Sequence, residues 1–141
     1  MAAATANAVI EGRGEGGIVP FAVKASTHIY RNTAVGVDPT VGYARPATAG
    51  ATPDIRCGIA REEVDNSSGA SGAKKVEVYT EGEFLLTGSG LAQTDVGSLV
   101  YWSDDSTITK TSTNNVLAGR ITETVSATQA WVRLLPFAVA S

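Results

Sequence analysis

The sequence predicts an all-β fold, a small barrel or sandwich of short antiparallel strands with an extended N-terminal arm and at most one or two short helical turns. Three observations predict it. Among 141 residues, Ala (21), Val (15) and Gly (15) are frequent, whereas aromatic residues make up only 6%. The candidate strands are short β-branched runs closely followed by turn residues. Residues 75–80 also alternate apolar and polar side chains, as a half-buried strand does.

Residues 1–17 form the predicted arm. They are rich in Ala and Gly, and Val9 and Ile10 are their only β-branched apolar residues. Because so little apolar surface cannot offset the entropy of ordering the segment, we expect the arm to be flexible alone and to order against a partner. Residues 18–141 are expected to form one β-rich domain, since a chain of this length suits a single core.

The first candidate strands lie between residues 18 and 37. Residues 18–24 are apolar and β-branched, and Pro20 favours a sheet edge, where its missing N–H leaves no ladder bond unmade. Residues 28–30 and 34–37 are two further, weaker candidates. Turns are predicted at Asp38-Pro39 and Arg45-Pro46, and loops at residues 47–53 and 65–72.

Residues 55–64 allow two interpretations. Good helix formers occupy residues 60–63, but Gly58 interrupts the pattern. The alternative is a strand that pairs with residues 75–80. Residues 83–86 are then expected to continue the 75–80 strand or to pair with it.

A faint internal repeat favours the strand interpretation. In both copies a segment with an early Gly is followed by a loop and then by an alternating strand. The segments are residues 56–62 and 76–78 in the first copy, and residues 117–123 and 131–133 in the second. Since any β-hairpin produces a similar pattern, the sequence agrees equally well with a true repeat and with a chance similarity.

Two hairpins and one helical turn are predicted in the C-terminal third. The helical turn is expected within residues 91–96, before Gly97. The hairpins have strands rich in Val, Ile, Leu, Thr and aromatic residues, joined by Ser, Asp and Thr turns. They join residues 98–102 to 107–111 and residues 116–124 to 130–135.

Composition and charge exclude several classes of protein. The net charge is −3 and no basic cluster exceeds Lys74-Lys75, so we do not expect nucleic-acid binding. No apolar stretch is long enough for a membrane span, and residues 1–14 lack the pattern of a secretory signal. A lone Cys57 cannot form an intrachain disulfide, which weakly suggests a reducing compartment.

No set of residues predicts an enzyme, a cofactor or a metal site. His28 is the only histidine, so a zinc site lacks ligands and a Ser-His-Asp triad lacks its sequence context. Cys57 has only Arg56 as a basic neighbour, so a structural thiol is expected. Adjacent Glu62 and Glu63 would face opposite sides of a strand. The acidic turn at Asp104-Asp105 has no calcium-loop spacing.

The heaviest apolar side chains of the C-terminal half are Tyr101, Trp102 and Trp131. Tyr101 and Trp102 are adjacent, so in a strand they face opposite sides. One is expected in the core, and the other in a second layer or at an interface. The sequence leaves open which of the two faces the core.

Residues 91–134 resemble the capsid decoration (cement) proteins of tailed bacteriophages. The resemblance rests on the runs VGSLVYWS, TITKT, NN, AGRI and WVRL, together with VEVYTEGEF further upstream. Ser98 stands where that family usually has Asp, and the loop at residues 66–73 is long. The resemblance covers about 60 residues well and about 110 loosely, and its motifs specify the scaffold rather than a reaction.

The resemblance implies a virion protein made in the host cytoplasm. It implies a homotrimer on the outer surface of an icosahedral capsid, which binds the major capsid protein and clamps adjacent capsomers. We expect the arm to add contacts there. The residues predicted at capsid or subunit interfaces are Val9, Ile10, Arg13, Trp102, Trp131 and Phe137.

The alternative function is that of an adhesion or carbohydrate-binding β-sandwich, from a phage fibre or a cell surface. Tyr43, Tyr79 or Trp131 would then serve as stacking platforms for sugars.

Overall fold

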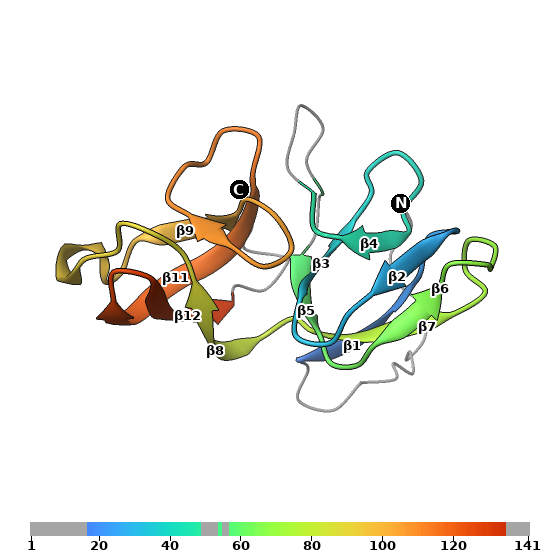
Figure 1. The fold of residues 1–141 in the computed structure, drawn as a ribbon, viewed down its shortest axis with the longest axis horizontal. Coiled ribbons are helices and arrows are strands. Elements are labelled where there is room, and N and C mark those ends of the chain that lie inside the picture. Colours follow the sequence, from blue (N-terminus) through green and yellow to red (C-terminus); the bar gives the residue numbers. More distant parts are fainter. Residues whose placement is uncertain (1–16, 49–53, 55–56, 135–141) are drawn as a thin grey trace, which may run out of the picture.

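The structure is a computed structural model that describes residues 17–48, 54 and 57–134 (Figure 1). The described residues form strands, joined by loops and by one 3₁₀ turn at Gln93–Asp95, so the all-β prediction is confirmed. The strands divide into two five-stranded sheets and one two-stranded sheet, and every pairing between strands is antiparallel.

Residues 17–80, here called the first half, form one large sheet and the small one. The large sheet has the order β1-β7-β5-β3-β4, and β2 pairs with β6 in the small sheet. Pro20 lies on the edge strand β1, and β7 alternates in burial, both as predicted. The strands are β1 (Ile18–Ala22), β2 (Thr27–Ile29), β3 (Ala34–Val37), β4 (Ala44–Pro46), β5 (Cys57–Ala60), β6 (Val64–Asn66) and β7 (Lys75–Tyr79).

Residues 81–134, the second half, form the other large sheet. Its order is β10-β9-β11-β12-β8, and both predicted hairpins are confirmed in it, as β9 with β10 and β11 with β12. The helical turn predicted before Gly97 is the 3₁₀ turn. The strands are β8 (Gly82–Thr87), β9 (Leu99–Trp102), β10 (Ile108–Thr109), β11 (Val116–Ser126) and β12 (Gln129–Leu134).

Two predicted turns or loops are strands in the structure. Arg45-Pro46 belongs to β4, and this is possible because β4 is an edge strand in which the absent N–H of Pro46 costs little. Asp65 and Asn66, predicted to open a loop, belong to β6. The Asn66 side-chain amide donates hydrogen bonds to the carbonyl oxygens of Lys24 and Ala70, both at 3.0 Å, and this fixes the strand end.

Two pairings also differ from the expectation. Within the segment 55–64, the described residues Cys57–Ala60 form β5, which pairs with β7 as the repeat suggested; after a bend, Val64 begins β6. β8 neither continues β7 nor pairs with it. It pairs with β12 instead, because the chain crosses into the second half at Thr80 and Glu81.

The two large sheets repeat one topology. In chain order, β1, β3, β4, β5 and β7 take the same places in the first sheet as β8, β9, β10, β11 and β12 take in the second. A parallel bridge also recurs near the outer strands, between Val23 and Ala44 in the first half and between Thr87 and Thr107 in the second. Each sheet thus closes towards a small barrel, and the chain is a tandem repeat of this unit.

The register of the strands repeats residue by residue. Equivalent cross-strand pairs occupy equivalent places, and most of their side chains are apolar. The pairs are Val35–Gly58 and Val100–Gly119, Ala60–Val78 and Ile121–Val132, Val37–Ala44 and Trp102–Ile108, and Val19–Val78 and Phe84–Val132. The small β2–β6 sheet has no counterpart in the second half and is an addition to the first.

The two glycines of the sequence repeat are structurally equivalent. A Cβ on Gly58 would collide with the carbonyl oxygen of Tyr79 and the side chain of Val78. A Cβ on Gly119 would collide with the carbonyl oxygen of Arg133 and approach the side chain of Val132. Both glycines therefore allow the neighbouring strand to approach closely at the same point of each barrel, which confirms the internal repeat.

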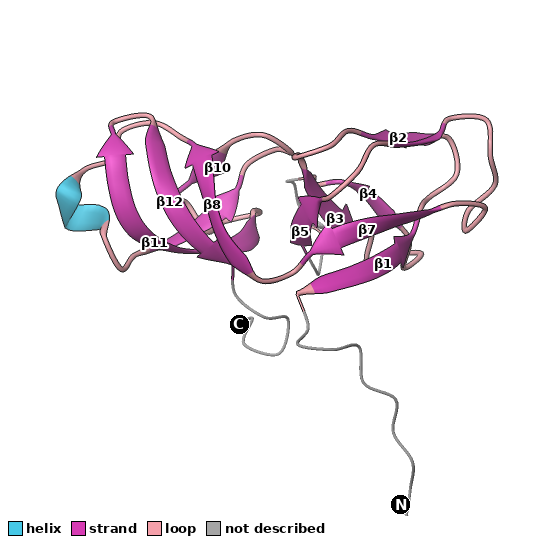
Figure 2. Ribbon diagram, turned by 90° about the horizontal axis from the view of Figure 1, so that it is seen from below, coloured by secondary structure: helices cyan, strands magenta, loops and turns pink. Residues whose placement is uncertain are grey.

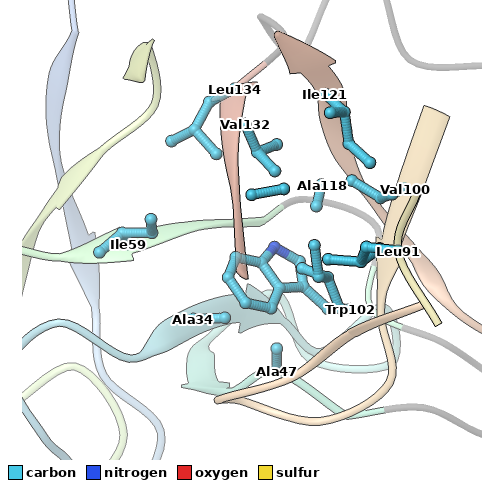
Figure 3. Close-up of a cluster of buried hydrophobic side chains, with 12 residues drawn as sticks. Ala34, Ala47, Ile59, Leu91, Val100, Trp102, Ala118, Ile121, Val132 and Leu134 are labelled. Carbon is cyan, nitrogen blue, oxygen red and sulfur yellow. The ribbon is translucent and has the colours of Figure 1, made fainter. Parts of the chain in front are cut away.

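The halves lie side by side along the long axis, with β2 and the 3₁₀ turn at opposite ends (Figure 2). Each encloses an apolar cluster, but the cluster of the second half also contains Ala34, Ala47 and Ile59 of the first. Figure 3 shows the indole of Trp102 beside Ala34 and Ala47. Trp102 is 3% exposed and Tyr101 is half-buried, so Trp102 is the member of the pair that faces the core.

We predict that Gly119→Ala and Gly58→Ala each destabilise the protein by about 1–3 kcal/mol, since a backbone carbonyl must move in each case. Urea unfolding followed by circular dichroism measures the change. Val125→Ala, on the same strand as Gly119 but 52% exposed, should stay within about 0.5 kcal/mol of the wild type. Wild-type stability of both glycine variants would contradict the close approach.

Candidate interaction surfaces

The contacts of His28 in the described structure are with an acidic and an aromatic side chain. His28 Nε2 lies 2.7 Å from Glu63 Oε2, and the imidazole stacks on Tyr30 with ring centroids 4.1 Å apart. Within the described residues, no three His, Cys, Asp or Glu side chains are grouped to hold a metal ion. No helix among them is long and apolar enough to cross a membrane.

Asp95 and Asp104 accept hydrogen bonds within local turns. Asp95 accepts hydrogen bonds from the Ala92 backbone N–H at 2.8 Å and from Lys110 Nζ at 3.2 Å, and these bonds lower the pKa of its carboxyl. Asp104 accepts from the Ser106 backbone N–H at 2.8 Å. These carboxylates therefore stabilise local turns.

A network of four charged residues supports the β3–β4 turn. Arg45 lies between two carboxylates, with Nη2 2.7 Å from Asp54 Oδ1 and Nη1 3.2 Å from Asp38 Oδ2. Lys24 Nζ adds a second cation 2.8 Å from Asp38 Oδ2. Backbone N–H groups of Thr40 and Thr48 donate to Asp38 and Asp54. The network joins the turn at residues 38–43 to the segment after β4.

The pKa values of the two aspartates of this network are shifted in opposite directions, because hydrogen bonds dominate at Asp38 and burial dominates at Asp54. The hydrogen bonds from Lys24 and from the Thr40 N–H hold the pKa of the Asp38 carboxyl below its ordinary value. The Asp54 carboxyl is fully buried, and the loss of solvation raises its pKa despite the hydrogen bond from Arg45.

One exposed sheet surface in the second half is the outer face of β8, β12, β11 and β9. It is defined here by Glu83, Leu85, Leu99, Arg120, Trp131 and Arg133, and is called the outer face. Leu85 and Trp131 are cross-strand partners, 43% and 37% exposed. Glu83 and Arg133 are also partners and form no ion pair with a described residue. A Trp beside unpaired Arg is typical of protein-binding surfaces.

The interface residues predicted from the sequence fall into three groups. Val9, Ile10, Arg13 and Phe137 lie outside the described residues. Trp102 is buried where the halves meet, so within one chain it serves the core. Trp131 lies on the outer face. Trp102 and Trp131 are therefore not brought together, and their contact with another molecule stays a prediction.

Leu85 and Val41 are among the exposed apolar residues that sequence reasoning missed. Leu85 is in the run Phe84-Leu85-Leu86, and the alternation of β8 turns only Leu85 outward. Val41, at the tip of the β3–β4 turn, is 49% exposed. An apolar residue in a Pro-Thr-Val-Gly turn was the available signal for Val41.

We predict opposite effects of Asp38→Asn and Asp54→Asn on acid unfolding. The lowered pKa of Asp38 makes the unfolded chain bind more protons, so its contribution to stability is lost as pH falls below about 4. In the Asp38→Asn variant, the free energy of unfolding should therefore fall less steeply between about pH 5 and pH 2 than in the wild type. The raised pKa of Asp54 makes the folded chain bind more protons, so in the Asp54→Asn variant the free energy of unfolding should fall more steeply. The midpoint of urea unfolding, measured for the wild type and both variants across this pH range, tests the prediction. If the midpoints of all three proteins fell with pH at the same slope, the assigned pKa shifts would be wrong.

Comparison with known proteins was informative at the level of the family. The sequence matches the family described as "Phage cement protein" over residues 13–135, which spans both halves. No curated protein and no solved structure gives a significant match. The match agrees with the resemblance in residues 91–134 and extends it to the first half. The chain belongs to the phage cement protein family, and is thus a structural bacteriophage protein associated with the capsid of the virion.

Proposed function

We propose that this protein binds the outer surface of an icosahedral phage capsid as a homotrimer and stabilises it by clamping adjacent capsomers. The observation that carries the proposal is the family match, which covers both barrels and part of the arm. The two barrels share an apolar cluster and are therefore packed tightly against each other. Such a body suits a protein that bridges two capsomers, because the two contact surfaces keep a fixed relative position.

The ends of the described chain support a role for the arm. The Thr80 N–H donates to the Gly17 carbonyl oxygen at 2.8 Å, and Leu134 is the cross-strand partner of Gly82. Both ends therefore flank the connection between the halves (Figure 2). We propose that residues 1–16 and Phe137 extend from this region to the major capsid protein, with Val9, Ile10 and Arg13 as contacts. Many weak contacts between the arms and one capsid would together give a high avidity.

The carbohydrate-binding alternative has less support. Tyr79 packs against Phe84 with ring centroids 5.5 Å apart, and Tyr43 is half-buried. Of the three proposed stacking residues, Trp131 alone is classed among the exposed large hydrophobics of the described chain. A single platform flanked by Glu83, Glu123 and Arg133 suits a protein partner better than a glycan chain.

We predict that the purified protein binds expanded phage heads that lack it and raises their disruption temperature. Added protein should saturate at a fixed ratio to the major capsid protein, measured by gel densitometry of sedimented heads. Unexpanded heads and bovine serum albumin serve as controls. Failure to sediment with heads, together with binding to a glycan array, would favour the alternative function.

We predict that deletion of residues 1–16 weakens head binding while the body stays folded, because Gly17 and its hydrogen bond to Thr80 remain. A full-length control, Val9→Ser/Ile10→Ser/Arg13→Ser, separates the role of these side chains from that of arm length. Occupancy is measured across a concentration series of protein. Wild-type occupancy curves for both variants would remove the arm from the proposal.

A further inference from the structure

We propose that the outer face of the second half is the contact surface for another copy of this chain, and that the β3–β4 turn of that copy docks on it. The contact is head to tail, from the first half of one copy to the second half of the next. This inference deepens the homotrimer part of the proposed function by naming the surfaces that meet.

The contact between the halves of one chain is the template. A row across the first sheet consists of Ala34, Ile59, Tyr79 and Ile18, as successive cross-strand partners. Ala34 and Ile59 are buried in the cluster of the second half, and Tyr79 packs against Phe84. The β9–β10 turn also touches this row, because the Ala34 N–H donates to the Asp105 carbonyl oxygen at 2.7 Å. One barrel therefore presents its outer sheet face to a turn of the next.

The repeat places an equivalent row on the second half. By register, Leu99, Arg120, Arg133 and Glu83 correspond to Ala34, Ile59, Tyr79 and Ile18. Arg120, Arg133 and Glu83 are exposed, and Arg120 Nη1 donates a hydrogen bond to the Gly97 carbonyl oxygen at 2.9 Å. Trp131 and Leu85 in the adjacent row widen the surface. The barrel face that is buried within the chain in the first half is thus left uncovered by the described residues in the second.

The first half carries the turn that matches this face. The β3–β4 turn at residues 38–43 is equivalent to the β9–β10 turn, since β3 and β4 correspond to β9 and β10. Val41 at its tip is exposed, and the Asp38–Arg45 ion pair fixes its base. A preformed turn with an apolar tip loses little entropy when it docks.

Charge favours contact between unlike halves. Residues 18–80 carry seven Lys or Arg and six Asp or Glu, whereas residues 81–134 carry three and six. The halves therefore have opposite net charge, and a contact between two second halves would bring like charges together. A head-to-tail contact of this kind closes into a ring when its rotation allows.

The polar character of the row fits a contact between separate chains. Ala34 and Ile59 are buried and both apolar, whereas the equivalent positions hold a half-buried Leu99 and an exposed Arg120. Interfaces that form between folded chains keep Arg and Trp and a polar rim. The replacement of an apolar row by a charged one therefore keeps the free chain soluble without removing the contact.

Mixed disulfide crosslinking tests the proposal. Two single-cysteine chains, Val41→Cys and Leu99→Cys, are each made with Cys57→Ser, and circular dichroism checks their folding. They are oxidised mildly, alone and mixed, both in solution and on saturated heads. We expect a crosslinked pair in the mixture and none with either variant alone. A mixture of Val41→Cys with Val125→Cys, an exposed β11 position outside the outer face, is the matched control.

The other outcomes overturn the assignment. Crosslinks of one variant with itself would show a two-fold contact, and crosslinks equal to the Val125→Cys control would show random collision. If trimers sediment, in solution or from heads, without the Val41–Leu99 crosslink, the homotrimer stands and these surfaces are wrong. If the crosslink forms but the protein does not bind heads, this inference stands and the proposed function fails.

Discussion

The burial of Trp102 against the first half is the interaction on which the arrangement of the molecule depends. The cluster of the second half is completed by Ala34, Ala47 and Ile59, so the second barrel obtains part of its core from the first (Figure 3). Truncation of a buried Trp costs about 3–5 kcal/mol, a large share of the stability of a domain of this size. The halves are therefore coupled, and the position of the outer face relative to the β3–β4 turn is fixed by this packing.

The strands that local patterns specify were predictable. Alternation identified β7, and short β-branched runs with Ser and Asp turns identified both C-terminal hairpins. The strand at Arg45-Pro46 was missed because an Arg-Pro pair is typical of a turn, whereas here it pairs with β3 as an edge strand, a position that the local sequence does not reveal. The partner of β8 could not be predicted either. Its pairing with β12 joins strands about 40 residues apart, and local sequence patterns carry no information on such a distant pairing.

The differences between the two halves explain why the internal repeat was only weakly visible in the sequence. The separation in sequence between equivalent residues changes along the chain. It is 65 positions for Ala34 and Leu99, 64 for Ala44 and Ile108, 61 for Gly58 and Gly119, and 54 for Val78 and Val132. Loops of different length and the added β2–β6 sheet break any fixed period. Only the glycines, whose backbone contacts tolerate no side chain, and a few core valines preserve identity. The candidate surfaces were therefore visible only in part, through Trp131.

The same scaffold carries two different outer rows, and the difference indicates which kind of contact each row can make. An apolar row in the first half, at Ala34 and Ile59, accepts a barrel of the same chain, where a short connection supplies a high effective concentration. The charged residues of the second-half row would need partners for Arg120 and Arg133 before they could be buried in the same way. This row therefore suits a contact that forms between two folded chains, where both surfaces are solvated before they meet.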